Sequence, residues 1–338
     1  MKKRFALLFL FLTVGAGLFQ AYLFIHKAPS SEAIYKIIEI EPGSTFLEVT
    51  DLLKQEALLA SPVSFRLLGK ITRNESKIKP GEYRLHSAMP PMELLDTLVR
   101  GDIVTYRIVI PEGTSSKEIG KILEKSDILD AEVFYRAAQD KAIIRKLGFD
   151  VESLEGYLFP DTYYFSKRIA PEKILRQMTR QFRAVYDDEF AKKAEELGMT
   201  QQEVLTLASI IEKETGAPSE RTTISGVFHN RLERKMRLQS DPTVIFALPD
   251  FDGDIRRKDL MYDSPYNTYR VKGLPPGPIS NPGRASIYAA LHPADVDYIF
   301  FVSKNNGEHH FSKTLREHNQ AVRKYQLKKK DEAMCRNC

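Results

Sequence analysis

The first 25 residues limit what this chain can fold into more than any other stretch does, because three basic residues near the start precede a long apolar run. Residues 1–4 carry three basic side chains, and residues 5–25 are almost entirely apolar. About 20 apolar residues span a bilayer as a helix, with basic flanks on the cytoplasmic side. A cleaved signal peptide is the alternative, but its apolar core is usually about 7–15 residues long. We therefore predict that residues 1–4 are cytoplasmic and that residues 5–25 form an uncleaved transmembrane anchor. Residues 26–35 are a predicted linker, and we expect the rest of the chain to lie outside the cytoplasm.

Composition and charge indicate a folded protein behind this segment. The 338 residues are 43% hydrophobic and 28% charged, with a net charge of +5. Basic residues are interspersed with acidic ones, so we expect no nucleic-acid partner. The only cysteines are Cys335 and Cys338, which we interpret as an incidental pair in a basic tail, residues 326–338. The body of the protein therefore depends on neither disulfides nor a thiolate metal site, and the role of the tail stays open.

A short pattern occurs twice along the chain, with an offset of 70 positions: Gly43 aligns with Gly113, and Glu48 aligns with Glu118. Each copy predicts a strand, a tight turn and a capped amphipathic helix. Residues 36–102 thus form a predicted strand–helix–helix–strand unit followed by a short helix. This unit resembles LysM modules, which bind N-acetylated glycans. A small α+β spacer that binds nothing is the alternative.

An aromatic-rich stretch, residues 157–165, interrupts a segment that is otherwise predicted to be helical, residues 130–200. Pro160 disfavours a continuous helix at this point. Aromatic side chains in such a loop can stack on sugar rings, but they also pack in cores. We expect Phe159 and Phe165 to belong to the core.

One predicted helix carries a candidate catalytic carboxyl group. Thr200 and Glu203 form a capping-box pattern that predicts its start. At about 100° per residue, Glu214 falls on the apolar stripe, whereas Glu212 lies toward the flank. The other members of the stripe are Val204, Leu207, Ile210 and Ile211, and the expected polar side carries Thr206 and Lys213.

The position of Glu214 favours a raised pKa, because desolvation disfavours the ionised carboxyl group. Such a group can act as a general acid near neutral pH. Alternatively, Glu214 caps the helix end or pairs with Arg221 or Arg231. Polar loops follow the helix, and they are rich in amides, hydroxyl groups, tyrosines, glycine and proline. They comprise residues 238–244, 266–269 and 273–283.

Five motifs together resemble the endolytic murein transglycosylase, or YceG-like, family. They are residues 154–163, 208–215, 238–244, 266–269 and 273–279, which occur in the family's order. The resemblance extends from the anchor to about residue 325. It implies an inner-membrane enzyme whose extracytoplasmic domain cleaves the β-1,4 bond between N-acetylmuramic acid and N-acetylglucosamine within nascent glycan strands. The products would carry 1,6-anhydromuramoyl ends, and cleavage would terminate strand elongation. Association with peptidoglycan synthases is a further expectation from the resemblance.

The resemblance also selects Glu214 as the catalytic residue, because Glu214 and Thr215 are similar to the Glu-Ser pair of lysozyme-like lytic transglycosylases. We expect Glu212 to hydrogen-bond nearby or to repel the charge on Glu214, and Asp241 to be structural. The other candidates, expected to orient acetamido and hydroxyl groups of the glycan, are Gln239, Ser240, Tyr266, Asn267 and Asn281.

Two other functions compete with this interpretation. A muramidase-type hydrolase would use Asp241 or Glu212 to activate water and would leave reducing ends. A non-catalytic glycan-binding scaffold of wall synthesis would not need Glu214. The histidines lack metal-binding spacing and no nucleotide-binding motif occurs, so we expect neither a metal nor a cofactor.

The predicted fold class is α+β. It comprises the transmembrane helix, the small LysM-like module and a larger catalytic domain with a lysozyme-like catalytic helix, residues 103–325.

Overall fold

The structure is a computed structural model that describes residues 13, 15, 22 and 25–327. The predicted anchor and the cysteine-containing tail therefore lie largely or wholly outside the described residues. Among the residues that are described, no helix combines the length and apolar content needed to cross a membrane. The described residues have a mixed α+β architecture, with helices and three two-stranded sheets.

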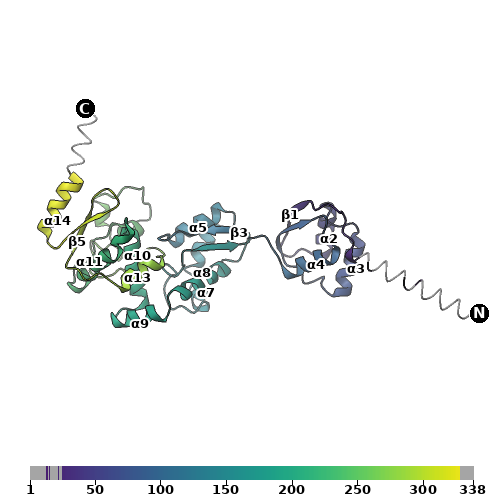
Figure 1. Ribbon diagram of the computed structural model, residues 1–338, viewed down its shortest axis with the longest axis horizontal. Coiled ribbons are helices and arrows are strands. Elements are labelled where there is room, and N and C mark those ends of the chain that lie inside the picture. The colour runs from purple at the N-terminus through teal and green to yellow at the C-terminus, as the bar shows by residue number, and fades with distance from the viewer. Residues whose placement is uncertain (1–12, 14, 16–21, 23–24, 328–338) are drawn as a thin grey trace, which may run out of the picture. The chain divides into compact units, whose positions relative to one another are not determined.

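The chain divides into two compact units, and Figure 1 labels many of their helices and strands. Unit 1 consists of Met1–Arg107 and Tyr164–Arg168, and unit 2 consists of Ile108–Tyr163 and Ile169–Cys338. All candidate site residues belong to unit 2.

Unit 1 has the predicted order of strand, two helices and strand. Its strands pair in an antiparallel register, with Tyr35 opposite His86 and Ile40 opposite Gly81. Apolar side chains from the sheet and helices, among them Leu53, Phe65 and Tyr83, form a buried core. The elements are β1 (Tyr35–Ile40), α2 (Phe46–Gln55), α3 (Pro62–Thr72), β2 (Gly81–His86) and α4 (Pro91–Arg100).

The repeated pattern has the same local structure in both copies. In each, a glycine with positive φ precedes a helix whose N-cap hydroxyl and third-residue glutamate form a reciprocal capping box. These interactions satisfy backbone N–H groups that a helix start would otherwise leave unpaired. The equivalent positions are Gly43 and Gly113, Thr45 and Ser115, and Glu48 and Glu118.

Unit 2 is mainly helical. Its helices are α5 (Ser116–Lys125), α6 (Ala131–Ala137), α7 (Lys141–Lys146), α8 (Pro171–Val185), α9 (Asp188–Glu196), α10 (Gln201–Glu214), α11 (Arg221–Glu233), α12 (Asp241–Ala247), α13 (Arg284–Leu291) and α14 (Leu315–Val322). Short helical turns occupy Pro218–Glu220, Asp259–Met261 and Arg323–Leu327. Strands β5 (Phe300–Ser303) and β6 (His309–Ser312) form an antiparallel hairpin. The remaining sheet pairs β3 (Tyr106–Val109) with β4 (Thr162–Phe165), and the division between the units falls within these strands.

Helix α10 is the central element of unit 2. It lies beside α13 (Figure 1) and also packs against α9, α11 and α12. Every residue from Val204 to Ile211 is consequently buried. The expectation that Thr206 lies on a polar side is wrong, because neighbouring helices cover that side as well. Its hydroxyl group donates to the carbonyl of Gln202 at 2.7 Å, which satisfies the buried donor.

The aromatic-rich stretch contributes to the core as expected. Phe165 is fully buried and Phe159 is 9% exposed. Tyr163 is also buried, and its hydroxyl group donates to the carbonyl of Phe159 at 2.6 Å. Phe159 and Tyr163 therefore stabilise unit 2, whereas Phe165 belongs to unit 1, and all three have little surface available for a sugar ring.

Candidate active site

Glu214 is the last residue of α10, and its side chain is half-buried. The Ser240 hydroxyl group donates to its Oε1 at 2.6 Å. Neither arginine considered from the sequence forms an ion pair with it. Arg221 lies 3.6 Å from Glu212 instead, and Arg231 donates to the carbonyls of Ile299 and Leu238. Glu214 is thus a carboxyl group without a salt-bridge partner among the described residues.

Burial raises the pKa of Glu214 to about 7. The hydrogen bond from Ser240 opposes this effect, the negative charge of Asp241 adds to it, and the positive charge of Arg231 lowers the pKa. A substantial fraction of the carboxyl groups is therefore protonated near neutral pH. A group with this pKa can both donate and accept a proton there.

Two loops hold Ser240 in place beside Glu214. The backbone N–H of Ser240 donates to Thr268 Oγ1 at 3.0 Å, and the N–H of Gln239 donates to the carbonyl of Thr268 at 3.1 Å. Tyr269 donates its hydroxyl hydrogen to Asp241 at 2.6 Å. Residues 238–244 and 266–269, which the sequence presented as separate polar loops, thus form one hydrogen-bonded support.

Gln239 and Tyr266 present polar surface from these loops. Gln239 has an exposed side chain and a left-handed backbone, with φ of 50°. The ring of Tyr266 packs against Phe246 with a centroid distance of 5.0 Å. Both rings line a cavity of about 250 Å³, and Tyr135, Gln139, Tyr157 and Gln202 line it as well. Aromatic faces combined with amide groups are suited to binding a sugar.

Asn267 and Asn281 have no exposed surface. The side-chain amide of Asn267 donates to the carbonyls of Leu260 and Tyr262 at 3.0 and 2.8 Å. Asn281 accepts from the N–H groups of Gly156 and Leu158 at 2.8 and 2.9 Å, and its amide donates to two other buried acceptors. In this conformation both asparagine side chains hold backbone segments together.

Glu212 also points away from Glu214. Its carboxylate accepts from the N–H of Gly283 at 2.9 Å, and Arg221 lies 3.6 Å away. Its charge raises the pKa of Glu112, for which burial is the larger cause. The like-charged neighbour that raises the pKa of Glu214 is Asp241 rather than Glu212.

A second buried carboxyl group, Glu155, was missed as a candidate in the sequence. Burial raises its pKa to about 7, although hydrogen bonds from Ser116 and Asn281 oppose that rise. The Ser116 hydroxyl group donates to it at 2.6 Å and the Asn281 amide at 2.9 Å. The sequence feature that could have indicated a buried carboxyl group is the position of Glu155 between Leu154 and Gly156, at the start of an apolar, aromatic-rich stretch.

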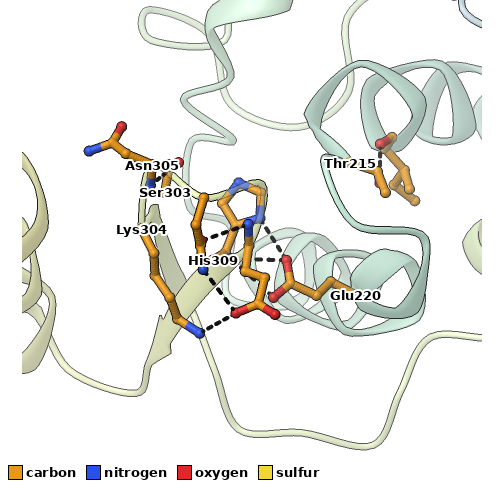
Figure 2. Close-up of polar contacts among 9 residues, drawn as sticks. Thr215, Glu220, Ser303, Lys304, Asn305 and His309 are labelled. Atoms are coloured by element: carbon orange, nitrogen blue, oxygen red, sulfur yellow. Dashed lines mark hydrogen bonds and ion pairs between the residues drawn. The ribbon is translucent and has the colours of Figure 1, made fainter.

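The β5–β6 hairpin supports the segment that follows Glu214. Figure 2 shows His309 of β6 facing Glu220, with a distance of 2.8 Å between Nδ1 and Oε2. Glu220 also accepts from the backbone N–H of His309 at 3.0 Å. Gly216 lies so close to the hairpin that an added Cβ would be 2.5 Å from the carbonyl oxygen of Gly307. The chain can make this close approach only because residue 216 has no side chain.

The described part of the chain contains no group of three histidine, cysteine or acidic side chains that could hold a metal ion. The site itself offers a carboxyl group with a raised pKa, held at a helix end beside polar loops.

Comparison with known proteins gives consistent matches over this region. The model of the YceG-like family matches residues 38–324. An endolytic murein transglycosylase of Bacillus subtilis is 34% identical over 304 residues, which is 85% of this chain and 84% of that protein. One from Streptococcus pneumoniae is 28% identical, over 85% of this chain and 58% of that protein. The crystal structure of a yceG-like protein from Listeria monocytogenes is 32% identical, with a TM-score of 0.59, over 85% of this chain and 98% of that one.

Proposed function

This chain belongs to the YceG-like family, and on that premise we propose that it is an endolytic peptidoglycan lytic transglycosylase. It cleaves the β-1,4 bond between N-acetylmuramic acid and N-acetylglucosamine within a glycan strand and leaves a 1,6-anhydromuramoyl end. The observation that carries the assignment of the catalytic residue is the environment of Glu214. Its carboxyl group has a pKa of about 7, no ion-pair partner within the described part of the chain and a hydroxyl group at 2.6 Å.

In the first step, protonated Glu214 donates its proton to the glycosidic oxygen while the bond from that oxygen to muramoyl C1 breaks. N-acetylglucosamine leaves with the proton as its free 4-hydroxyl group. The positive charge that develops at C1 is stabilised by the substrate's own 2-acetamido group, as in other substrate-assisted glycosidases. The Ser240 hydroxyl group stabilises the carboxylate that forms on Glu214.

In the second step, the Glu214 carboxylate removes the proton from the muramoyl C6 hydroxyl group. The C6 oxygen attacks C1, the anhydro bond forms and Glu214 returns to its protonated state. One carboxyl group suffices because the nucleophile is tethered to the reacting sugar, which gives a large gain in effective concentration. No water molecule is consumed.

The surroundings of the other carboxylates support this scheme over hydrolysis. A muramidase would need a second carboxylate that is free to activate water. Asp241 accepts the Tyr269 hydroxyl group, and Glu212 accepts the N–H of Gly283. Both carboxylates are therefore engaged by the protein, whereas the second step above requires only Glu214.

Substrate binding is proposed for Gln239 and Tyr266, whereas the buried Ser240 acts on Glu214. Ser240 positions Glu214, Gln239 presents its amide to the strand, and Tyr266 stacks on a sugar ring in the cavity of about 250 Å³. Asn267 and Asn281 are positioning residues whose buried side chains hold the loops in place through hydrogen bonds.

We further propose that residues 5–25 anchor the protein in the inner membrane and hold both units outside the cytoplasm. The βααβ order of unit 1 supports a LysM-like role in binding N-acetylated glycan. Cleavage of nascent strands would then occur near the membrane, where peptidoglycan synthases are the expected partners and cleavage ends strand elongation. Retention of isolated unit 1 on insoluble peptidoglycan, compared with a buffer-treated cellulose control, tests the glycan-binding role.

The catalytic proposal is tested by digesting purified glycan strands with wild-type protein and with Glu214→Gln. Mass spectrometry of the products should find anhydromuramoyl ends from the wild type and none from the variant. Glu195→Gln, which removes an exposed carboxylate from α9, is the matched control and should retain wild-type activity. Cleavage by Glu214→Gln at the wild-type rate would contradict the role of Glu214, and reducing ends would identify a hydrolase.

A further inference from the structure

A second cavity, of about 650 Å³, lies in unit 2 and has no role in the mechanism above. Its volume is in the range of sites that bind small molecules or short peptide segments. The lining combines three basic side chains with apolar and aromatic surface. The residues are Arg237, Arg257, Leu260, Met261, Tyr269 and Arg270.

This cavity adjoins the candidate active site through Tyr269. The Tyr269 side chain lines the cavity and donates its hydroxyl hydrogen to Asp241 at 2.6 Å. Asp241 directly follows Ser240, whose hydroxyl group donates to Glu214 at 2.6 Å. If part of the substrate binds in this cavity, that part lies near the bond that Glu214 cleaves.

The positive charge of the cavity is only partly neutralised by the residues that the structure describes. Among the described residues, neither the Arg237 nor the Arg257 guanidinium group has an ion-pair or hydrogen-bond partner, and both side chains are exposed. The third arginine is partly occupied, since Arg270 donates to the carbonyl of Met261 at 2.8 Å and lies 3.5 Å from Asp263. Two free guanidinium groups at one cavity are suited to binding carboxylates, which they can contact through paired N–H groups.

We propose that this cavity binds the carboxylate-bearing stem peptide of the substrate, which extends from the lactyl group of muramic acid. Arg237 and Arg257 contact the peptide carboxylates, and the apolar surface of Leu260 and the 67%-exposed Met261 contacts the aliphatic side chains of the peptide. This inference rests on the proposed function, since it assigns a specificity site to the same enzyme. It implies that the enzyme recognises strands that carry charged peptides.

The test compares native glycan strands with strands whose peptide carboxylates have been converted to neutral amides by carbodiimide coupling. Amidation leaves the glycan and the peptide length unchanged. Full-length protein in detergent is assayed as the wild type, Arg237→Gln, Arg257→Gln, the double variant and Arg180→Gln. Arg180 is an exposed arginine on α8 outside the cavity and controls for the loss of one positive charge. The rate of formation of anhydromuramoyl ends gives kcat and KM.

For the wild type we expect KM to rise at least fivefold on amidated strands, with kcat within about twofold. On native strands each single cavity variant should raise KM by up to about fivefold, a range typical of an exposed ion pair. The double variant should have the same KM for native and amidated strands, and Arg180→Gln should behave as the wild type.

Equal KM values of the wild type for native and amidated strands would overturn this inference while leaving the proposed function intact. Equal sensitivity of the double variant and the wild type to amidation would overturn it as well, because the charge would be recognised elsewhere. Absence of anhydromuramoyl ends with every substrate would instead contradict the proposed function.

Discussion

Replacing Glu214 by glutamine keeps the shape of the side chain but removes its ionisable group, so its effect on stability should depend on pH. The pKa of the folded-state carboxyl group is about 7, against an ordinary value of 4.5. A tenfold difference in proton affinity corresponds to about 1.4 kcal/mol, so the full difference amounts to roughly 3 kcal/mol. Because Glu214 is half-buried rather than enclosed, we expect about 2–3 kcal/mol.

The direction of the effect follows from proton linkage. Between pH 4.5 and 7 the folded protein retains a proton on Glu214 that the unfolded chain has already released. The wild type therefore loses stability as pH rises through this window, and the loss is complete above pH 7. The glutamine variant avoids this cost. It should match the wild type near pH 4 and exceed it by about 2–3 kcal/mol at pH 8.

Urea unfolding followed by circular dichroism from pH 4 to 8 measures this difference. Glu195→Gln on α9 controls for the loss of one negative charge. Glu155 also has a pKa of about 7, so the glutamine variant should retain part of the wild-type pH dependence. A stability difference between Glu214→Gln and the wild type that is equal at pH 5 and pH 8 would refute the reasoning. Glu214 would then have an ordinary pKa and would be a poor general acid at neutral pH.

Three other substitutions test the supports of the site. Ser240→Ala removes a hydrogen bond that lowers the pKa of Glu214, so the pH above which kcat falls should rise by up to about one pH unit, as a kcat profile would reveal. Asn281→Ala leaves four buried hydrogen bonds unmade and should destabilise unit 2 by about 3–5 kcal/mol in urea; a loss below about 1 kcal/mol would contradict its structural role. Gly216→Ala places a methyl group 2.5 Å from the Gly307 carbonyl oxygen and should cost about 1–3 kcal/mol, with lower kcat; unchanged stability and kcat would show that the hairpin does not support the site.

Local patterns predicted several elements well because each depends on residues that are close in sequence. The capping boxes at Thr45, Ser115 and Thr200 are all present, as are the helices that they begin. Helical periodicity also distinguished the two neighbouring carboxyl groups at the end of α10. Glu214 faces Ser240, whereas Glu212 faces the backbone of Gly283.

Sequence patterns are least informative where tertiary contacts decide the environment of a residue. Thr206 is buried because helices surround α10 on more than one side, which a single amphipathic stripe does not predict. Asn267 and Asn281 occur in polar loops, but both are buried and their amides donate to backbone carbonyl groups, that of nearby Leu260 for Asn267 and that of distant Thr114 for Asn281. Glu155 gains its raised pKa from burial and its hydrogen bonds from Ser116 and Asn281, which lie 39 and 126 positions away.

The central claim is that Glu214 catalyses an intramolecular transfer rather than hydrolysis, and isotope labelling tests this most directly. Glycan strands are cleaved by the wild-type protein in water enriched in oxygen-18, and the masses of the new muramoyl ends are measured. The account predicts 1,6-anhydro ends that contain no heavy oxygen, because the C6 hydroxyl group supplies the nucleophile. Reducing ends that carry one heavy oxygen would contradict it, since water would then have been the nucleophile.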